Sequence, residues 1–219
     1  MACDLINAWK SADTCKLTMA GTGDQMYLFD KKAWLKRIAE AKNARTSGIT
    51  MSSLPTPGKG GWYGKNAEGA EDAEAVAKMQ LLKGYLVGVD IKTDSGEVTG
   101  TKDEGSQASS QAVSFVVDDN IEDFNETAHA MRFTDFGAFV PRANGGYYVV
   151  LSAFKSARFS NSFTTGTTYD SDHGHTVTVT AAPTDYDVCF WDPGEDLYTW
   201  CKGVDQTTVS PEARFRTDE

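Results

Sequence analysis

The sequence predicts a mainly β protein of the α+β kind: a β-sandwich or β-barrel with one packed helix and with inserted helical and loop segments. Two segments, residues 112–117 and 175–180, are rich in β-branched or alternating side chains, which is typical of strands. Between them, residues 121–131 follow a helical period. Gly145 and Gly146 then mark a tight turn next to an apolar run, as in a β-hairpin.

The composition is that of a folded protein with its own core. Hydrophobic residues make up 40% of the 219 residues and aromatic residues 11%, which excludes global disorder. We expect a single β-sandwich domain over residues 1–202, with insertions at about residues 31–82 and 94–111, and a polar C-terminal tail over residues 203–219. The net charge of −10 disfavours binding to nucleic-acid backbones and to anionic membranes.

Neither a secretion signal nor a membrane span is expected. The N-terminus lacks a basic region, and no apolar run approaches the roughly 18 residues of a membrane span. We therefore predict synthesis in the cytoplasm.

The N-terminal part predicts two strands followed by a helix. Residues 16–19 and 25–29 are short apolar runs separated by a glycine-containing turn. Asp30 is a suitable N-cap for a helix over residues 31–45, and Gly48 is a suitable stop. The side chains expected on one face of this helix are Trp34, Leu35, Ile38 and Ala41.

Residues 47–66 are rich in Pro and Gly, which predicts a long loop. Trp62 and Tyr63 are adjacent on this loop, and loops gain little from exposing two large rings. Two interpretations stay open: the rings fold back onto their own domain, or they dock on a neighbouring subunit, where Trp and Tyr are common anchors. Trp62 and Tyr63 are therefore our candidate subunit-interface residues.

The next three segments predict a helix, a strand and a loop. Residues 71–82 have a helical composition, and residues 84–93 have the apolar content of a strand. Residues 94–111 are polar and contain glycines, so we expect a mobile loop or an excursion that becomes ordered only against a partner. The expected apolar faces are Val76, Met79 and Leu82 in the helix and Leu86, Val87, Val89 and Ile91 in the strand.

The helix over residues 121–131 has the clearest signals. Asp118, Asp119 and Asn120 offer an N-cap, and acidic residues in the first turn complement the helix dipole. We expect its apolar stripe to pack across one sheet. The stripe consists of Ile121, Phe124, Ala128 and Met131.

The sequence contains no recognisable catalytic or metal-binding motif. The four cysteines lack C-x-x-C spacing, so we predict unbridged, partly buried thiols; they are Cys3, Cys15, Cys189 and Cys201. His173 and His175 flank a glycine, but only three histidines exist in the chain. A nucleophile elbow is also missing. We therefore expect no enzyme activity, no metal and no cofactor.

The order of these segments resembles that of tail tube proteins of tailed bacteriophages, in particular divergent forms from phages of gut Bacteroides-type hosts. The resemblance covers about two-thirds of the chain. It rests on the strand over residues 111–117, the helix over 121–131, the hairpin over 139–150, the turn and strand over 165–180, and the opening over 21–29.

This resemblance implies a structural protein of the virion tail, made in the host cytoplasm. Copies of such a protein join edge to edge into a ring, usually six-fold, and the rings stack into a tube that conducts the genome. The implied partners are other copies of the chain and other tail or neck proteins. DNA passes through without specific binding, and an acidic inner wall would help to keep it from sticking.

A different class of function remains open: a ligand- or glycan-binding β-sandwich module, such as a fibre or adhesin-like domain. Exposed aromatic rings would serve it, and the candidates are Trp62, Tyr63, Trp191 and Trp200. The two functions differ in assembly state, because a tube protein forms rings or long particles whereas a binding module stays small.

Overall fold

The structure of the protein is a computed structural model. It describes residues 25–46, 48–92, 95–102, 108–117, 135–142, 145–153, 155, 157–164 and 174–203. Several sequence predictions lie outside these residues: the strand over 16–19, the helix over 121–131 with its apolar stripe, the turn over 165–173 with His173, the thiols of Cys3 and Cys15, and the C-terminal tail after residue 203.

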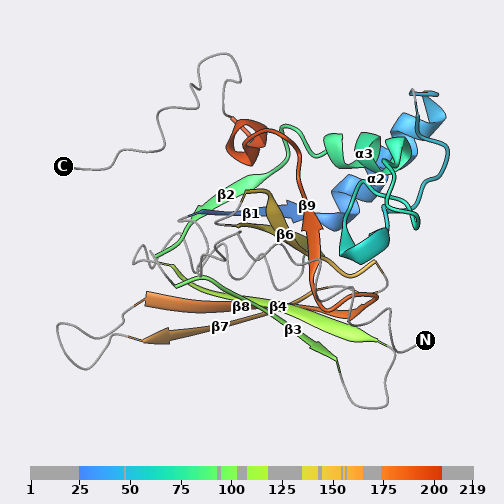
Figure 1. The fold of residues 1–219 in the computed structure, drawn as a ribbon. Coiled ribbons are helices and arrows are strands. Elements are labelled where there is room, and N and C mark those ends of the chain that lie inside the picture. Colours follow the sequence, from blue (N-terminus) through green and yellow to red (C-terminus); the bar gives the residue numbers. More distant parts are fainter. Residues whose placement is uncertain are drawn as a thin grey trace, which may run out of the picture.

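Two antiparallel sheets face each other, which confirms the predicted mainly β sandwich (Figure 1). The five-stranded sheet has the order β2 (Val87–Asp90), β1 (Gln25–Asp30), β5 (Phe136–Pro141), β6 (Tyr147–Val150) and β9 (Cys189–Trp191). The four-stranded sheet has the order β3 (Glu97–Lys102), β4 (Ser109–Val117), β8 (Gly174–Thr184) and β7 (Arg158–Thr164).

Alternating side chains of both sheets fill the space between them. In β1, Met26 and Leu28 point into this inter-sheet core, whereas Tyr27 and Phe29 point to the opposite face. The other sheet contributes a matching alternation from β4 and β8. The buried members there are Val113, Phe115, Val177, Val179 and Ala181.

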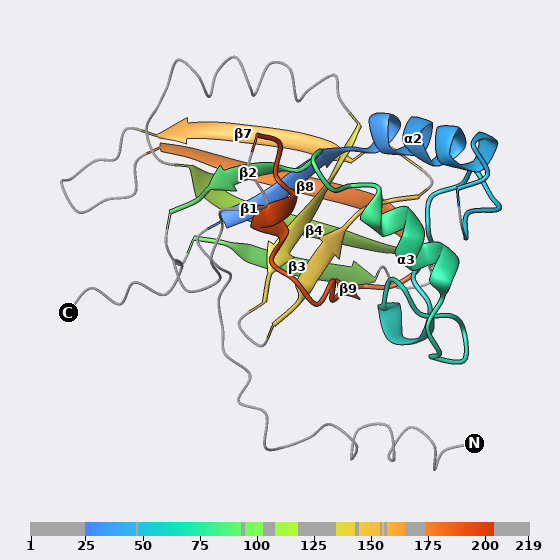
Figure 2. The same ribbon diagram turned by 90° about the horizontal axis from the view of Figure 1, so that it is seen from above.

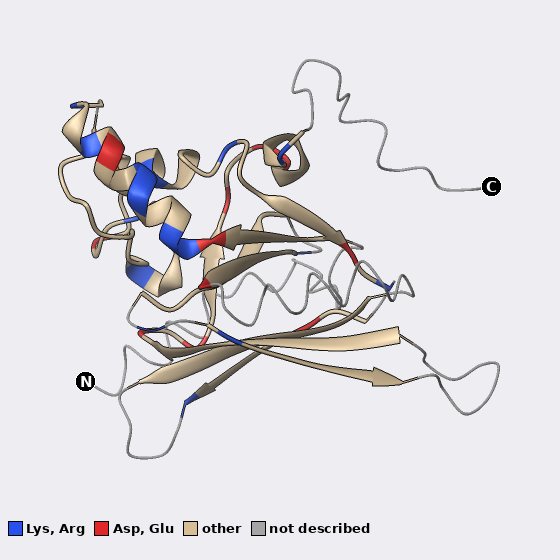
Figure 3. Ribbon diagram, turned by 180° about the vertical axis from the view of Figure 1, so that it is seen from behind, with Lys and Arg blue, Asp and Glu red and all other residues tan. Residues whose placement is uncertain are grey.

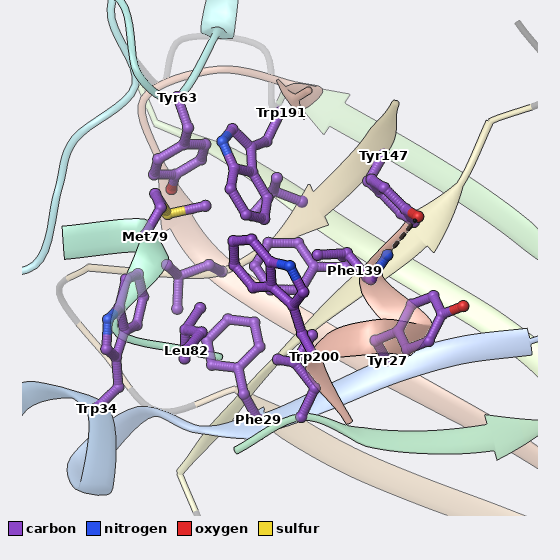
Figure 4. Packing of buried hydrophobic residues seen from close by; sticks show 14 of the residues in the cluster. Tyr27, Phe29, Trp34, Tyr63, Met79, Leu82, Phe139, Tyr147, Trp191 and Trp200 are labelled. Atoms are coloured by element: carbon purple, nitrogen blue, oxygen red, sulfur yellow. Dashed lines mark hydrogen bonds between the residues drawn. The ribbon is translucent and has the colours of Figure 1, made fainter. Parts of the chain in front are cut away.

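A third layer covers the far face of the five-stranded sheet. It consists of α2 (Lys31–Asn43), α3 (Ala73–Gln80), the 3₁₀ turn η1 (Lys59–Gly61), the 3₁₀ turn η2 (Leu197–Trp200) and the segments between them. Figure 2 shows α2 and α3 side by side at one end of the strands. The second core lies under this layer and is rich in aromatic rings (Figure 4). The central strands β1, β5 and β6 of the five-stranded sheet are therefore buried on both faces.

The first helix begins at Lys31, where the sequence predicts, and the second begins at Ala73, two residues after the predicted start. The side chain of Asp30 accepts hydrogen bonds from the main-chain N–H groups of Lys32 (2.7 Å) and Ala33 (3.1 Å), which caps α2. Asp72 caps α3 in the same way through the N–H of Ala75, at 3.0 Å. Trp34 is buried as expected, but Leu35 is exposed and the prediction for that residue is wrong.

The interpretation of residues 94–111 as a loop is wrong for the part that the structure describes. Glu97–Lys102 forms β3, and β4 begins at Ser109 rather than near residue 112. An edge strand needs few apolar side chains, because main-chain hydrogen bonds to one neighbour hold it. Val87 in β2 was expected to be buried and is instead exposed. Strands β7 and β9 were not predicted.

Candidate functional site

The four-stranded sheet has two open edges. β3 pairs only with β4 and β7 only with β8 among the strands that the structure describes. The two edge strands have similar lengths, six residues in β3 and seven in β7. An unpaired edge presents a row of N–H and C=O groups that can join another strand. These edges are therefore candidate assembly sites.

The face of this sheet that points away from the core consists mainly of hydroxyl side chains. Two pairs of hydroxyls contact each other across strands, Thr101 with Ser110 (2.6 Å) and Thr178 with Ser114 (3.3 Å). In Figure 3 only short parts of the ribbon of this sheet have the colours of Lys, Arg, Asp or Glu. The outward positions are Glu97, Thr99, Thr101, Ser110, Ala112, Ser114, Val116, Arg158, Ser160, Ser162, Thr164, Thr176, Thr178 and Thr180.

A second candidate site is a cleft of about 540 Å³ in the third layer. We call it the aromatic cleft. Its walls come from four parts of the chain: the loop after η1, α3 with the residues before it, the turn after β9, and η2. The lining residues are Trp62, Tyr63, Gly64, Lys65, Glu71, Val76, Gln80, Trp191, Asp192, Pro193, Gly194 and Trp200.

The aromatic cleft brings together all four rings that the sequence suggested for ligand binding, but it does not expose them equally. Tyr63, Trp191 and Trp200 are only 4%, 3% and 1% exposed and belong to the second core. Burial raises the pKa of Tyr63 well above its ordinary value. Trp62 alone among the four is half-buried. The expectation of four exposed rings is therefore wrong for three of them.

Trp62 is held by both its backbone and its ring. Its C=O accepts a 2.9 Å hydrogen bond from Gly58, and the next N–H, of Tyr63, donates to the C=O of Phe190 at 2.8 Å. Its ring packs on the Phe190 ring with centroids 5.2 Å apart. The guanidinium of Arg142 lies 4.7 Å from the Phe190 centroid and 5.8 Å from that of Trp62. Trp62 thus packs within its own chain; a further contact with a second copy stays a prediction.

Four exposed polar or charged residues surround the aromatic cleft. They are Lys65, Glu71, Gln80 and Asp192. One carboxylate oxygen of Asp192 accepts from the N–H of Gly194, at 2.9 Å, which fixes the turn after β9. The side chains of Glu71 and Gln80 make no hydrogen bond with any residue that the structure describes. Donors and acceptors are therefore available at the rim.

The cysteine and histidine side chains that the structure describes are buried, and none of them lines the aromatic cleft. Cys189 and Cys201 form no disulfide within the described part of the chain. Burial raises the pKa of Cys189 to about 11. His175 lies under Phe163, with ring centroids 4.8 Å apart. The described residues hold no group of three or more His, Cys, Asp or Glu side chains arranged for a metal.

Comparison with protein-family models, curated proteins and solved structures gives no match to this chain. The resemblance to tail tube proteins therefore rests on the sequence segments alone. Among the described residues, none of the helices has the length and apolar character needed to cross a bilayer.

Proposed function

We infer that the protein is a structural virion component whose copies join into rings, and that the rings stack as the tail tube of a bacteriophage. The observation that carries the proposal is the pair of edge strands of the four-stranded sheet, β3 and β7, neither of which has a second neighbour among the described strands. The resemblance to tail tube proteins, over residues 21–29, 111–117, 121–131, 139–150 and 165–180, supplies the type of assembly.

The strand directions make the two edges complementary. Each neighbouring pair in the order β3, β4, β8, β7 is antiparallel, so β3 and β7 run in opposite directions. If β7 of one copy lies beside β3 of the next, the two strands pair antiparallel and the sheet continues. This contact is head-to-tail, and a ring of such contacts leaves no edge of the four-stranded sheet open. Six copies, as the resemblance implies, would close a barrel of about 24 strands.

Opposite charges at the two edges favour this contact. Glu97 on β3 and Arg158 on β7 are the charged residues among the described positions of the outward face. In register, the row that contains Glu97 crosses the sheet to Ser160, two residues from Arg158. In a joined sheet, a register that brings the next copy's Glu97 opposite Arg158 would place the two opposite charges on the same face. Opposite charges across strands stabilise pairing.

The order of the layers favours the hydroxyl face as the lining of the ring. The five-stranded sheet and the helices pack against the face of the four-stranded sheet that is opposite the hydroxyl face (Figure 1). This broader side fits the larger outer circumference of a ring. The inner wall would then be a hydroxyl surface with balanced charges rather than an acidic one. Such a wall offers DNA phosphates no excess of positive charge to bind.

Charge reversal tests the proposal directly. The purified protein is expected to form rings or tubes in negative-stain images and large particles in light scattering. Glu97→Arg alone and Arg158→Glu alone should each weaken assembly, because like charges then meet at the contact. The double variant should restore assembly. Glu68→Arg, an exposed reversal near the aromatic cleft, is the matched control and should assemble normally.

Two results would contradict the proposal. One is a wild-type protein that stays monomeric at high concentration. The other is assembly that responds to neither single reversal, which would place the contact elsewhere. Circular dichroism of each variant separates a loss of assembly from a loss of folding.

A further inference from the structure

The aromatic cleft has the features of a preformed small-molecule site. Its volume of about 540 Å³ lies within the range of about 300–1,000 Å³ that is usual for ligand pockets. Trp191 and Trp200 form a rigid floor, with ring centroids 5.2 Å apart (Figure 4). Trp62 forms a wall and is fixed from behind by Phe190. These protein rings are already fixed before a ligand binds, which lowers the entropic cost of binding.

The backbone of the loop after η1 is also fixed in place. Gly61 has φ +80°, and a Cβ atom there would lie 2.6 Å from the C=O oxygen of Val188. This close approach holds the loop against the segment between β8 and β9. Glycine is needed here for both the positive φ and the close contact. The Trp62 wall thus belongs to the rigid part of the fold.

One buried polar group in this floor is unsatisfied. The indole Nε1–H of Trp200 has no hydrogen-bond partner among the described residues, although the side chain is only 1% exposed. A buried N–H without a partner is costly. Because this N–H is shielded from solvent, a ligand would use the exposed side chains of Gln80 and Glu71 at the rim instead.

The lining residues select among classes of ligand. Phosphates and other anions would meet the carboxylates of Glu71 and Asp192 in a protein of net charge −10. Organic cations would meet positive charge already near the Trp62 ring, where the Lys65 ammonium lies 4.9 Å from the centroid. Purely apolar ligands would leave the polar rim unpaired. A neutral molecule with many hydroxyls avoids all three penalties.

We propose that the aromatic cleft binds a neutral saccharide. The apolar C–H face of a sugar ring stacks on the exposed part of Trp62, and its hydroxyls bond to Gln80, Glu71 and Asp192. The site lies within one chain and on the side of the molecule opposite the hydroxyl face, so it is independent of the proposed ring contact.

Titration of the full chain with soluble oligosaccharides tests the proposal. Cellohexaose, maltohexaose and chitohexaose serve as probes, with tryptophan fluorescence and calorimetry as readouts. At least one is expected to bind saturably. Trp62→Ala should weaken binding about tenfold or more, because stacking is lost, whereas Trp62→Phe should retain part of it. Gln80→Ala should weaken it less. Tyr85→Ala, an exposed ring outside the aromatic cleft, should change nothing.

The outcomes separate this proposal from the assembly proposal. Failure of all three sugars to bind at millimolar concentration would overturn it, as would sugar binding that Trp62→Ala leaves unchanged. Tighter binding of tetramethylammonium or inorganic phosphate would assign the site to another class of ligand and would also overturn it. The edge variants Glu97→Arg and Arg158→Glu should bind sugar like the wild type even when they fail to assemble.

Discussion

The indole Nε1–H of Trp34 on α2 donates a 2.8 Å hydrogen bond to the main-chain carbonyl of Lys78 on α3. The ring of Trp34 also meets Phe29 of β1 edge to face, with centroids 5.3 Å apart. One side chain therefore joins two helices to the five-stranded sheet. Short helices depend on such tertiary contacts, because helices of this length are marginal on their own. The helical layer is thus a packed part of the domain.

Trp34→Phe should destabilise the protein by about 1–3 kcal/mol, because it removes the donor to Lys78 and leaves part of the ring's volume unfilled. Urea denaturation followed by circular dichroism measures the change. Leu35→Ala on the same helix is the control, since Leu35 is exposed, and it should cost less than about 1 kcal/mol. Equal effects of the two substitutions would mean that the helical layer contributes little to global stability.

Gly137→Ala should cost about 1–3 kcal/mol through overpacking. A Cβ atom at Gly137 would overlap the ring of Phe29, with Cε2 2.8 Å away. That ring cannot move aside easily, because it is stacked on Phe139 with centroids 4.8 Å apart. Gly88→Ala in β2 is the matched control, since its Cβ would meet only Cys201 Sγ, at 3.5 Å. Thermal melts of both variants measure the difference in stability. Similar melting temperatures would show that Phe29 has room to shift.

Strands with a strong apolar pattern could be predicted from the sequence, and edge strands could not. Residues 113–115 and 176–180 alternate large apolar and hydroxyl side chains, because one of their faces is buried and the other is not. β3 lacks that pattern, since its residues are mostly exposed and are held by pairing with β4. β9 is only three residues long, which is too short for any period to show.

The third layer and the aromatic cleft could be predicted only in part. Met26–Phe29 are four consecutive buried residues, which is typical of a strand covered on both faces. That run was a signal for a layer beyond the sandwich. The meeting of Trp62 with Trp191 and Trp200 had no such signal, because the rings are more than a hundred residues apart in the chain. Only the packing of η2 and the loop after η1 brings them together.

Cys189 should react slowly with thiol reagents in the folded protein. Burial raises its pKa to about 11, although a 3.1 Å hydrogen bond from Gln111 Nε2 acts in the opposite direction. At pH 8 the thiolate fraction is then on the order of one in a thousand, and the thiol is also shielded from the reagent. Labelling with iodoacetamide, followed by mass spectrometry of peptides, measures the rate. Protein unfolded in guanidinium is the control and should react at the rate of an ordinary cysteine. Equal rates in the folded and unfolded protein would show that β9 opens readily.

Glu74 should make the stability of the protein sensitive to acid. A hydrogen bond from Lys78 Nζ at 2.7 Å, and a further one from the Thr50 hydroxyl, lower the pKa of Glu74 from 4.5 to about 2. Because the folded-state pKa is the lower one, this contribution is complete above pH 4.5 and is lost as the pH falls toward 2. Glu74→Gln should therefore lower the melting temperature at pH 7, where it leaves the buried Lys78 ammonium without its carboxylate. The difference from the wild type should shrink between pH 4.5 and pH 2 and then vanish.

Glu68→Gln is the control and should show no difference in melting temperature from the wild type that changes with pH. A constant gap for Glu74→Gln at every pH would mean that the substitution acts through packing rather than through the charge.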